Sequence, residues 1–201
     1  TKDFAYLAEQ INDMGFAAVE AVISCPHTPG FGTMGGQSTP QAAAEITSAI
    51  RKKTGLPLFI KLSPNVEGIG RIAKAAEDAG ADCITAVNTL GPGMVIDVRT
   101  AKPVLGGIVG GISGPALKPV AVRCVYDIYK SVSIPIIGTG GVMTGSDAAE
   151  MILAGASAVG IGSAVYYRGI DVFRKVCEEL DALMKECNYR NIEAMRGKAH
   201  E

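Results

Sequence analysis

Short apolar runs alternate with longer stretches of helical periodicity along the whole chain. Five of these runs are rich in β-branched or other apolar residues and finish in small or polar residues, as buried parallel strands do. The predicted strands are Val19–Ile23, Leu58–Leu62, Cys83–Asn88, Ile134–Gly138 and Ala158–Gly162. The alternation of strand and helix predicts a series of βα units.

The predicted helices lie before, between and after these strands. They fall at Asp3–Met14, Thr39–Lys53, Gly68–Ala79, Pro115–Ser131, Ser146–Ala154 and Ile170–Cys187. Proline follows Thr39 and Gly114, where a first helical turn accepts it, and Gly80 and Gly155 stand where helices should stop. The polar segment Tyr189–Glu201 is expected to fray.

Residues 90–113 break this rhythm. They hold two short apolar pieces, Met94–Val98 and Val104–Leu105, and then the glycine-rich run Gly106–Gly111. We predict an inserted hairpin or loop within a single domain of residues 1–201. Five βα units suit either an open doubly wound sheet or part of an eight-stranded barrel, and periodicity alone leaves both open.

Composition narrows the classes of function. The 201 residues are 48% hydrophobic and 19% charged, which indicates a globular protein rather than a disordered one. The formal net charge of −1 and the scattered Lys and Arg residues argue against nucleic acid or an anionic membrane as partner. No apolar run reaches the roughly 18 residues of a membrane span, and no signal-peptide pattern is present, so we expect a cytoplasmic protein.

The five cysteines are odd in number, widely spaced and without a CxxC pair, so we predict no disulfide framework and no zinc or iron–sulfur site. We expect Cys83, Cys124, Cys177 and Cys187 to be buried thiols. Cys25 ends the first predicted strand, where neighbouring groups can tune its pKa for proton transfer. By itself it would also fit a buried apolar position.

The strand ends carry most of the candidate chemistry, because ligands bind beyond the carboxyl ends of the strands in both architectures. The last two strands end in Gly138-Thr139-Gly140-Gly141 and Gly160-Ile161-Gly162-Ser163. Glycines before a helix let backbone N–H groups approach a phosphate, so two such ends together predict a phosphate site. Either glycine pair alone would indicate an ordinary tight turn.

Four polar side chains have two interpretations each. Lys61 lies inside an apolar strand and needs an anionic partner, so it is either a salt-bridged lysine or a cation that faces a cofactor. We favour the cofactor, because strand-end sites gather there. Asn88 and Thr89 could hold a small polar ring or cap the following turn. His27 could contact substrate or be solvated.

These residues, in their order along the chain, resemble a known family. The matching stretches are Ser24–His27, Lys61–Asn65, Asn88-Thr89, Ile96–Pro103, Gly111–Ala116 and Gly138–Gly141. They look like class 1 (cytosolic) dihydroorotate dehydrogenase over about residues 15–190. The Ser24–His27 and Gly30–Thr33 sequences look most like archaeal members of the two-subunit, NAD-linked type. Dihydropyrimidine dehydrogenases share the first of these, but residues 96–107 and 110–119 look closer to dihydroorotate dehydrogenase.

The resemblance implies a TIM-type (β/α)8 barrel, of which this chain supplies the C-terminal five βα units, with FMN as cofactor. It implies oxidation of dihydroorotate to orotate in pyrimidine (UMP) biosynthesis, with Cys25 as the base that removes the C5 proton while hydride passes from C6 to the flavin. Substrate contacts are implied for Asn88, Thr89 and His27. Flavin contacts are implied for Lys61, Val87, Gly114, Gly140, Gly141, Gly162 and Ser163, the last five around the phosphate.

The resemblance also implies partners, namely a homodimer and an electron-transfer subunit that carries FAD and an iron–sulfur cluster. This chain departs from the family at Val22, where an asparagine usually contacts flavin and substrate. The family also has about three further strands ahead of the cysteine strand, so we expect an N-terminal part that this sequence lacks. The alternatives are a dihydropyrimidine dehydrogenase-like flavoenzyme and a phosphate-binding barrel fragment without catalysis.

Overall fold

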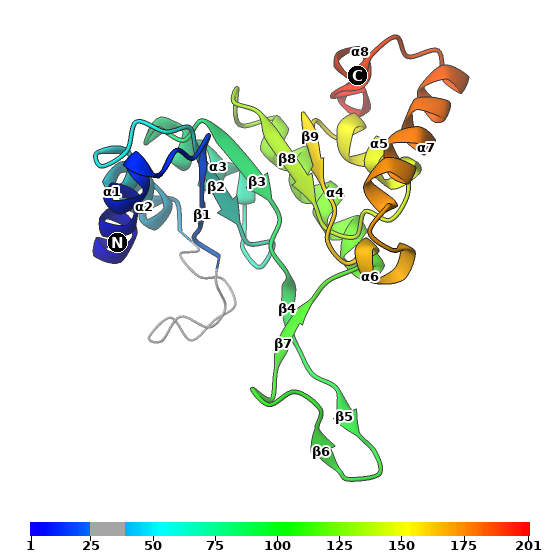
Figure 1. Ribbon diagram of the computed structural model, residues 1–201, viewed down its shortest axis with the longest axis horizontal. Coiled ribbons are helices and arrows are strands. Elements are labelled where there is room, and N and C mark those ends of the chain that lie inside the picture. The colour runs from blue at the N-terminus through cyan, green and yellow to red at the C-terminus, as the bar shows by residue number, and fades with distance from the viewer. Residues whose placement is uncertain (25–38) are drawn as a thin grey trace.

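A computed structural model describes residues 1–24 and 39–201 of the chain. At its centre is a five-stranded parallel sheet (Figure 1). The strands are β1 (Val19–Val22), β2 (Leu58–Leu62), β3 (Cys83–Ala86), β8 (Ile136–Thr139) and β9 (Ala158–Gly160). All five predicted strands are confirmed, with small shifts at their ends.

The order of the strands decides between the two architectures. Their order in the sheet is β1-β2-β3-β8-β9, which is also their order along the chain. A doubly wound sheet reverses at a switch point, whereas the strands of a β/α barrel follow one another in sequence. The structure is therefore an α/β fold with five βα units of a TIM-type barrel, as the resemblance implied.

The helices also match the predicted positions. They are α1 (Lys2–Ile11), η1 (Asn12–Met14), α2 (Pro40–Arg51), α3 (Ile69–Asp78), η2 (Pro115–Leu117), α4 (Lys118–Tyr129), α5 (Gly145–Leu153) and α7 (Val172–Glu186). As predicted, Pro40 is the first residue of α2, and Gly80 and Gly155 lie just after the ends of α3 and α5. The structure adds that the Thr39 hydroxyl caps α2 and that both glycines have a positive φ. In the described ranges no helix has both the length and the apolar character needed to cross a membrane.

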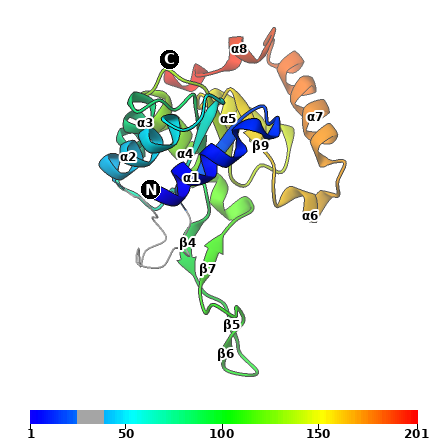
Figure 2. The same ribbon diagram turned by 60° about the vertical axis from the view of Figure 1, so that its left-hand side comes forward.

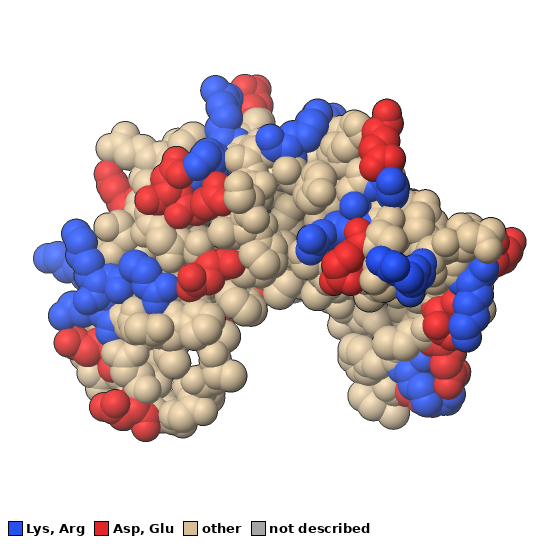
Figure 3. All heavy atoms as spheres, turned by 90° about the horizontal axis from the view of Figure 1, so that it is seen from above, with Lys and Arg blue, Asp and Glu red and all other residues tan. Residues whose placement is uncertain are grey.

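The helices pack on one face of the sheet and leave the other face open. In β2, Leu58, Ile60 and Leu62 are buried in the core, while Phe59 and Lys61 between them stay partly exposed. Side chains alternate between the two faces of a strand, so this pattern means that only one face of β2 is fully covered, whereas all four residues of β3 beside it are buried. Seen from above in Figure 3, the molecule is an arch around an open hollow, with Lys and Arg interspersed among Asp and Glu.

Residues 90–112 leave the sheet as a projecting arm, visible in Figures 1 and 2. Its strands form two antiparallel pairs, β4 (Leu90–Gly93) with β7 (Gly110–Ile112) and β5 (Ile96–Asp97) with β6 (Lys102–Pro103). Nine large apolar side chains of the arm are 38 to 90% exposed: Met94, Val95, Ile96, Val98, Val104, Leu105, Ile108, Val109 and Ile112. So many exposed apolar groups on one segment indicate a contact surface.

The C-terminal tail packs against the helices, so the prediction that Tyr189–Glu201 frays is wrong. The tail forms α8 (Ile192–Met195) and η3 (Lys198–His200), and Met195 is fully buried against α5. The His200 ring stacks on Tyr126 of α4, with 3.8 Å between the ring centroids. Two well-placed side chains therefore dock a segment whose composition is mostly polar.

The cysteine prediction holds for two of the four cysteines that the structure describes. Cys83 and Cys124 are buried, and burial raises the pKa of each thiol to about 11. Cys177 and Cys187 are exposed, so the prediction of burial is wrong for them. Cys177 follows the buried Val176 on α7, and one step along a helix turns a side chain away from its neighbour's face; Cys187 lies at the end of the same helix.

This difference predicts which thiols react. When the native chain is treated with iodoacetamide at mildly alkaline pH, we expect alkylation of Cys177 and Cys187 and protection of Cys83 and Cys124, because the thiolate is the reactive form. Peptide mass mapping of native and guanidinium-unfolded samples measures this. Equal labelling of Cys83 and Cys177 in the native sample would contradict the burial.

Candidate functional site

A cavity of about 150 Å³ opens at the carboxyl ends of β2, β3, β8 and β9. It is lined by Lys61, Val87, Asn88, Thr89, Ser113, Gly114, Leu117, Thr139, Gly140, Gly141, Gly162 and Ser163. Nine of these residues were singled out from the sequence, and they are all of the predicted site residues that the structure describes. Cys25 and His27 lie outside the described residues.

Sequence reasoning did not assign Ser113, Leu117 or Thr139 to the site. Ser113 and Thr139 stand directly beside the predicted glycines, so their position in the motifs was the available signal. A wider hollow of about 450 Å³ near Pro135 and Arg196 lies at the opposite end of the sheet. In β/α barrels that end contributes to stability, and ligands bind at the carboxyl end.

The glycine turns form one end of the cavity. Gly141 has a φ of 76°, and a Cβ added there would lie 2.7 Å from the carbonyl oxygen of Gly114 and 2.8 Å from the backbone nitrogen of Lys118. Only glycine fits such a close approach in a left-handed conformation. Gly162 is different, because a Cβ added there would meet no atom within 4 Å. Its backbone therefore borders open space in the cavity lining.

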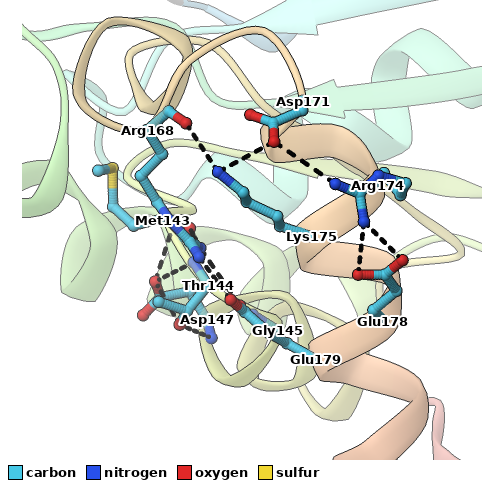
Figure 4. A network of polar contacts seen from close by, with 10 residues as sticks. All are labelled: Met143, Thr144, Gly145, Asp147, Arg168, Asp171, Arg174, Lys175, Glu178 and Glu179. Carbon is cyan, nitrogen blue, oxygen red and sulfur yellow. Dashed lines mark hydrogen bonds and ion pairs between the residues drawn. The ribbon is translucent and has the colours of Figure 1, made fainter.

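A polar network holds together the segments that follow β8 and β9 (Figure 4). Arg168, the last residue of α6 (Ala164–Arg168), donates a hydrogen bond of 2.6 Å to the Met143 carbonyl and pairs with Glu179 of α7. Glu179 also accepts a 2.7 Å hydrogen bond from the N–H of Gly145. The hydrogen bond from Arg168 lowers the pKa of Glu179. The segments that follow β8 and β9 are thus held to the same helix.

Asp147 links this network to α4. One carboxylate oxygen accepts hydrogen bonds of 2.9 Å from the N–H groups of Met143 and Thr144, and the other pairs with Lys118 at 2.8 Å. Burial pulls the pKa of Asp147 upward, but the Lys118 ammonium and the two N–H groups outweigh it and lower the pKa. Lys118 begins α4, so Asp147 and Arg168 together connect α4, the turn after β8 and α6.

Lys61 enters the cavity from β2. Its Nζ lies 3.8 Å from Oε1 of Glu20 in β1, and its side chain is 26% exposed. Glu20 is therefore the anionic partner that was expected for Lys61. Lys61 fits both interpretations, because it forms an ion pair and also lines the cavity. Sequence reasoning missed Glu20, although a carboxylate between Val19 and Ala21 in an apolar strand was a comparable signal.

Asn88 ties the end of β3 to the end of β1. Its Nδ2 donates a 2.9 Å hydrogen bond to the carbonyl oxygen of Ser24, the residue before Cys25. This contact is not the turn cap that was the alternative for Asn88. Thr89 packs closely against Gly111 of β7, since a Cβ added to Gly111 would lie 2.0 Å from the Thr89 hydroxyl oxygen. The arm therefore begins at the cavity.

The cavity combines two kinds of environment. The strand order β2-β3-β8-β9 places the glycine turns after β8 and β9 on one side of the lining, and a lysine of β2 with an amide and a hydroxyl after β3 on the other. Such an arrangement suits an elongated ligand with a phosphate at one end and a polar ring at the other. Across residues 1–24 and 39–201, no group of three or more His, Cys, Asp or Glu side chains could hold a metal ion.

Comparisons with known proteins agree with this geometry. The family model described as dihydroorotate dehydrogenase matches residues 1–184. The chain is 45% identical over 201 residues to the catalytic subunit of dihydroorotate dehydrogenase B (NAD(+)) from Methanothermobacter thermautotrophicus, covering 100% of this chain and 66% of that protein. The corresponding subunit from Methanocaldococcus jannaschii is 45% identical over 200 residues, covering 100% of this chain and 64% of that protein.

A solved structure is similar as well. The crystal structure of DHODH from Eimeria tenella in complex with ferulenol matches with a TM-score of 0.79 and 26% identity, covering 97% of this chain and 57% of that chain. The chain thus spans about two thirds of the length of the curated relatives, 66% and 64% for the two named above. On the family model and on these identities, the chain belongs to the dihydroorotate dehydrogenase family.

Proposed function

We propose that this chain carries the flavin-binding and substrate-binding part of an enzyme that oxidises dihydroorotate to orotate in pyrimidine biosynthesis. The observation that carries the proposal is the single cavity lined by all nine described residues of the predicted site. The names of the relatives support it, since each is the catalytic subunit of a dihydroorotate dehydrogenase B (NAD(+)).

The cofactor that we propose is FMN, and the residues present fit it. The open space at Gly162 leaves room for a phosphate, and the close backbone contacts at Gly141 fix the shape of the neighbouring turn, with Gly114, Gly140 and Ser163 also in the lining. Lys61 supplies a cation for the ring, and Val87 supplies an apolar contact. Bound FMN would accept the hydride that leaves C6 of the substrate.

The substrate roles follow the same layout. Asn88 and Thr89 would hold the pyrimidine through hydrogen bonds, with His27 as a further contact. Cys25 would act as the base that takes the proton from C5. Cys25 and His27 are assigned from the sequence resemblance. The Asn88–Ser24 hydrogen bond supports the role of Cys25 as the base. Ser24 directly precedes Cys25 in the sequence, and Asn88 lines the cavity.

An electron acceptor is also required, because reduced flavin must be reoxidised after each turnover. The relatives are named as catalytic subunits, which implies a second kind of subunit in those enzymes. We propose that an electron-transfer subunit with FAD and an iron–sulfur cluster serves this chain, in which the sequence offers no cluster-binding cysteine pattern.

We further propose that the arm contacts a second copy of the chain. Replacing Val98, which is 90% exposed, by aspartate should convert a dimer into a monomer, because a charge in an apolar contact must be desolvated. Light scattering after size-exclusion chromatography measures the mass. Ile170→Asp, at a 78% exposed apolar residue before α7, is the matched control and should remain dimeric. A monomeric wild-type chain would contradict the homodimer.

Titration with FMN tests the proposed function. We expect the purified chain to quench FMN fluorescence and to keep the yellow colour through gel filtration, with inorganic phosphate as a competitor. A chain that stays colourless after incubation with FMN would overturn the flavin proposal and leave a phosphate-binding fragment as the alternative. In that event phosphate alone should still bind, which equilibrium dialysis measures.

A further inference from the structure

Three polar side chains lie together on the face of the sheet that the helices do not cover. Thr85 of β3 donates a 2.6 Å hydrogen bond to Oε2 of Glu20, and Lys61 of β2 lies 3.8 Å from Oε1 of the same carboxylate. The strand register explains the grouping, because Lys61 is the partner of Thr85 on one side and of Val22 on the other. Glu20 is two residues before Val22 and therefore on the same face.

The two oxygens of Glu20 thus have separate partners. Thr85 is only 3% exposed, so it is a fixed anchor, and its hydrogen bond orients the carboxylate with the second oxygen toward Lys61. Lys61 in turn lines the cavity. These contacts link the buried Thr85 through Glu20 to the Lys61 ammonium at the cavity.

Among residues 1–24 and 39–201, the acidic side chain paired with Lys61 is Glu20. The nearby positions on this face are Val22, Phe59 and Cys83, and burial raises the pKa of the Cys83 thiol to about 11, which keeps it uncharged at neutral pH. The Lys61–Glu20 pair is about one quarter to one third exposed, and pairs of this kind add little to stability. The main effect of the pair is therefore to fix the position of the Lys61 ammonium.

We infer that Glu20 is a positioning residue of the flavin site, which holds the Lys61 ammonium at the cavity while Thr85 holds Glu20. The identity of the ligand, FMN, rests on the proposed function. The positioning of Lys61 by Glu20 rests on the contacts alone. Glu20 also offsets part of the Lys61 charge that acts on a bound ring. Removing the carboxylate charge should therefore favour reduced, more negative FMN over oxidised FMN.

The positioning is tested in the chain without FMN. In Glu20→Gln and in Thr85→Val, we expect the NMR order parameter of the Lys61 side chain to fall toward that of Lys185, whose side chain is 75% exposed. Thr85→Val keeps the Glu20 charge and removes only its anchor. The exposed Glu186 on α7 provides the matched control, Glu186→Gln, which should leave Lys61 unchanged. If Lys61 is equally mobile in wild type and Glu20→Gln, the inference is overturned.

The electrostatic part is tested with FMN. We expect Glu20→Gln to change the ratio of the dissociation constants for oxidised and reduced FMN several-fold in favour of the reduced form, with no change in Glu186→Gln. An unchanged ratio in Glu20→Gln would overturn this part. Failure of the wild-type chain to bind FMN would instead contradict the proposed function, and the order-parameter test of Glu20 would stand on its own.

Discussion

Replacing Gly162 by alanine is expected to weaken FMN binding about 10- to 100-fold without changing the thermal stability of the chain. The added methyl group would meet no protein atom within 4 Å, so the fold has room for it. It would project where the phosphate is proposed to approach the backbone. Loss of one charge-assisted hydrogen bond, about 1.5–3 kcal/mol, corresponds to this change in affinity. Fluorescence titration with FMN and calorimetry measure the two effects.

Replacing Gly141 by alanine should instead lower the thermal stability of the chain. Alanine at a φ of 76° is strained, and its Cβ would lie within 2.8 Å of the backbone at Gly114 and Lys118. The left-handed backbone costs about 1–2 kcal/mol and the shift needed to relieve the contact about 1–3 kcal/mol, so the midpoint of thermal unfolding should fall by roughly 5 to 15 °C. Gly141 is thus needed for the backbone conformation of its turn, and Gly162 for the space that the phosphate would occupy.

Gly106 provides the control for both. It also has open space around an added Cβ, but it lies in the arm, away from the cavity lining. Gly106→Ala should change neither FMN affinity nor thermal stability. If Gly162→Ala binds FMN as tightly as Gly106→Ala, the phosphate does not lie at Gly162, and the proposed orientation of the ligand is wrong.

The site could largely be predicted from the sequence because its residues follow strands. Parallel strands bring their carboxyl ends to the same edge of the sheet, so Lys61, Asn88 and Gly140 converge although they are far apart in the chain. The glycines were also informative locally, since helix stops at Gly80 and Gly155 and the close turn at Gly141 depend on backbone conformation near the residue. Local patterns were sufficient for both features.

What the sequence could not reveal depends on contacts between distant residues. The choice between a barrel and a doubly wound sheet rests on strand order, which periodicity does not encode. The docking of His200 on Tyr126 and the pairing of Glu20 with Lys61 each join segments far apart in the chain. Arg168 lies at the end of a five-residue helix that was not predicted, because so short an element has little periodic signal.

Replacing Cys25 by alanine in the intact enzyme is expected to lower kcat by about 10²-fold or more, with FMN still bound. Alanine cannot accept the C5 proton, and a positioned general base contributes about 10²- to 10⁴-fold to such a step. Anaerobic mixing of the enzyme with dihydroorotate, followed by the loss of flavin absorbance, measures the first turnover directly. Cys177→Ser, at the exposed cysteine on α7, is the control and should keep the wild-type rate.

Cys25→Ser separates a chemical role from a structural one. The serine hydroxyl has a similar size but is a weaker base at neutral pH, so removal of the C5 proton should become slower relative to hydride transfer from C6. Deuterium at C5 should therefore slow flavin reduction more in Cys25→Ser than in the wild type. An undiminished rate in Cys25→Ala would remove Cys25 from the mechanism. Weaker FMN binding in Cys25→Ser, with an unchanged isotope effect when the variant is saturated with FMN, would assign the residue to binding instead of proton transfer.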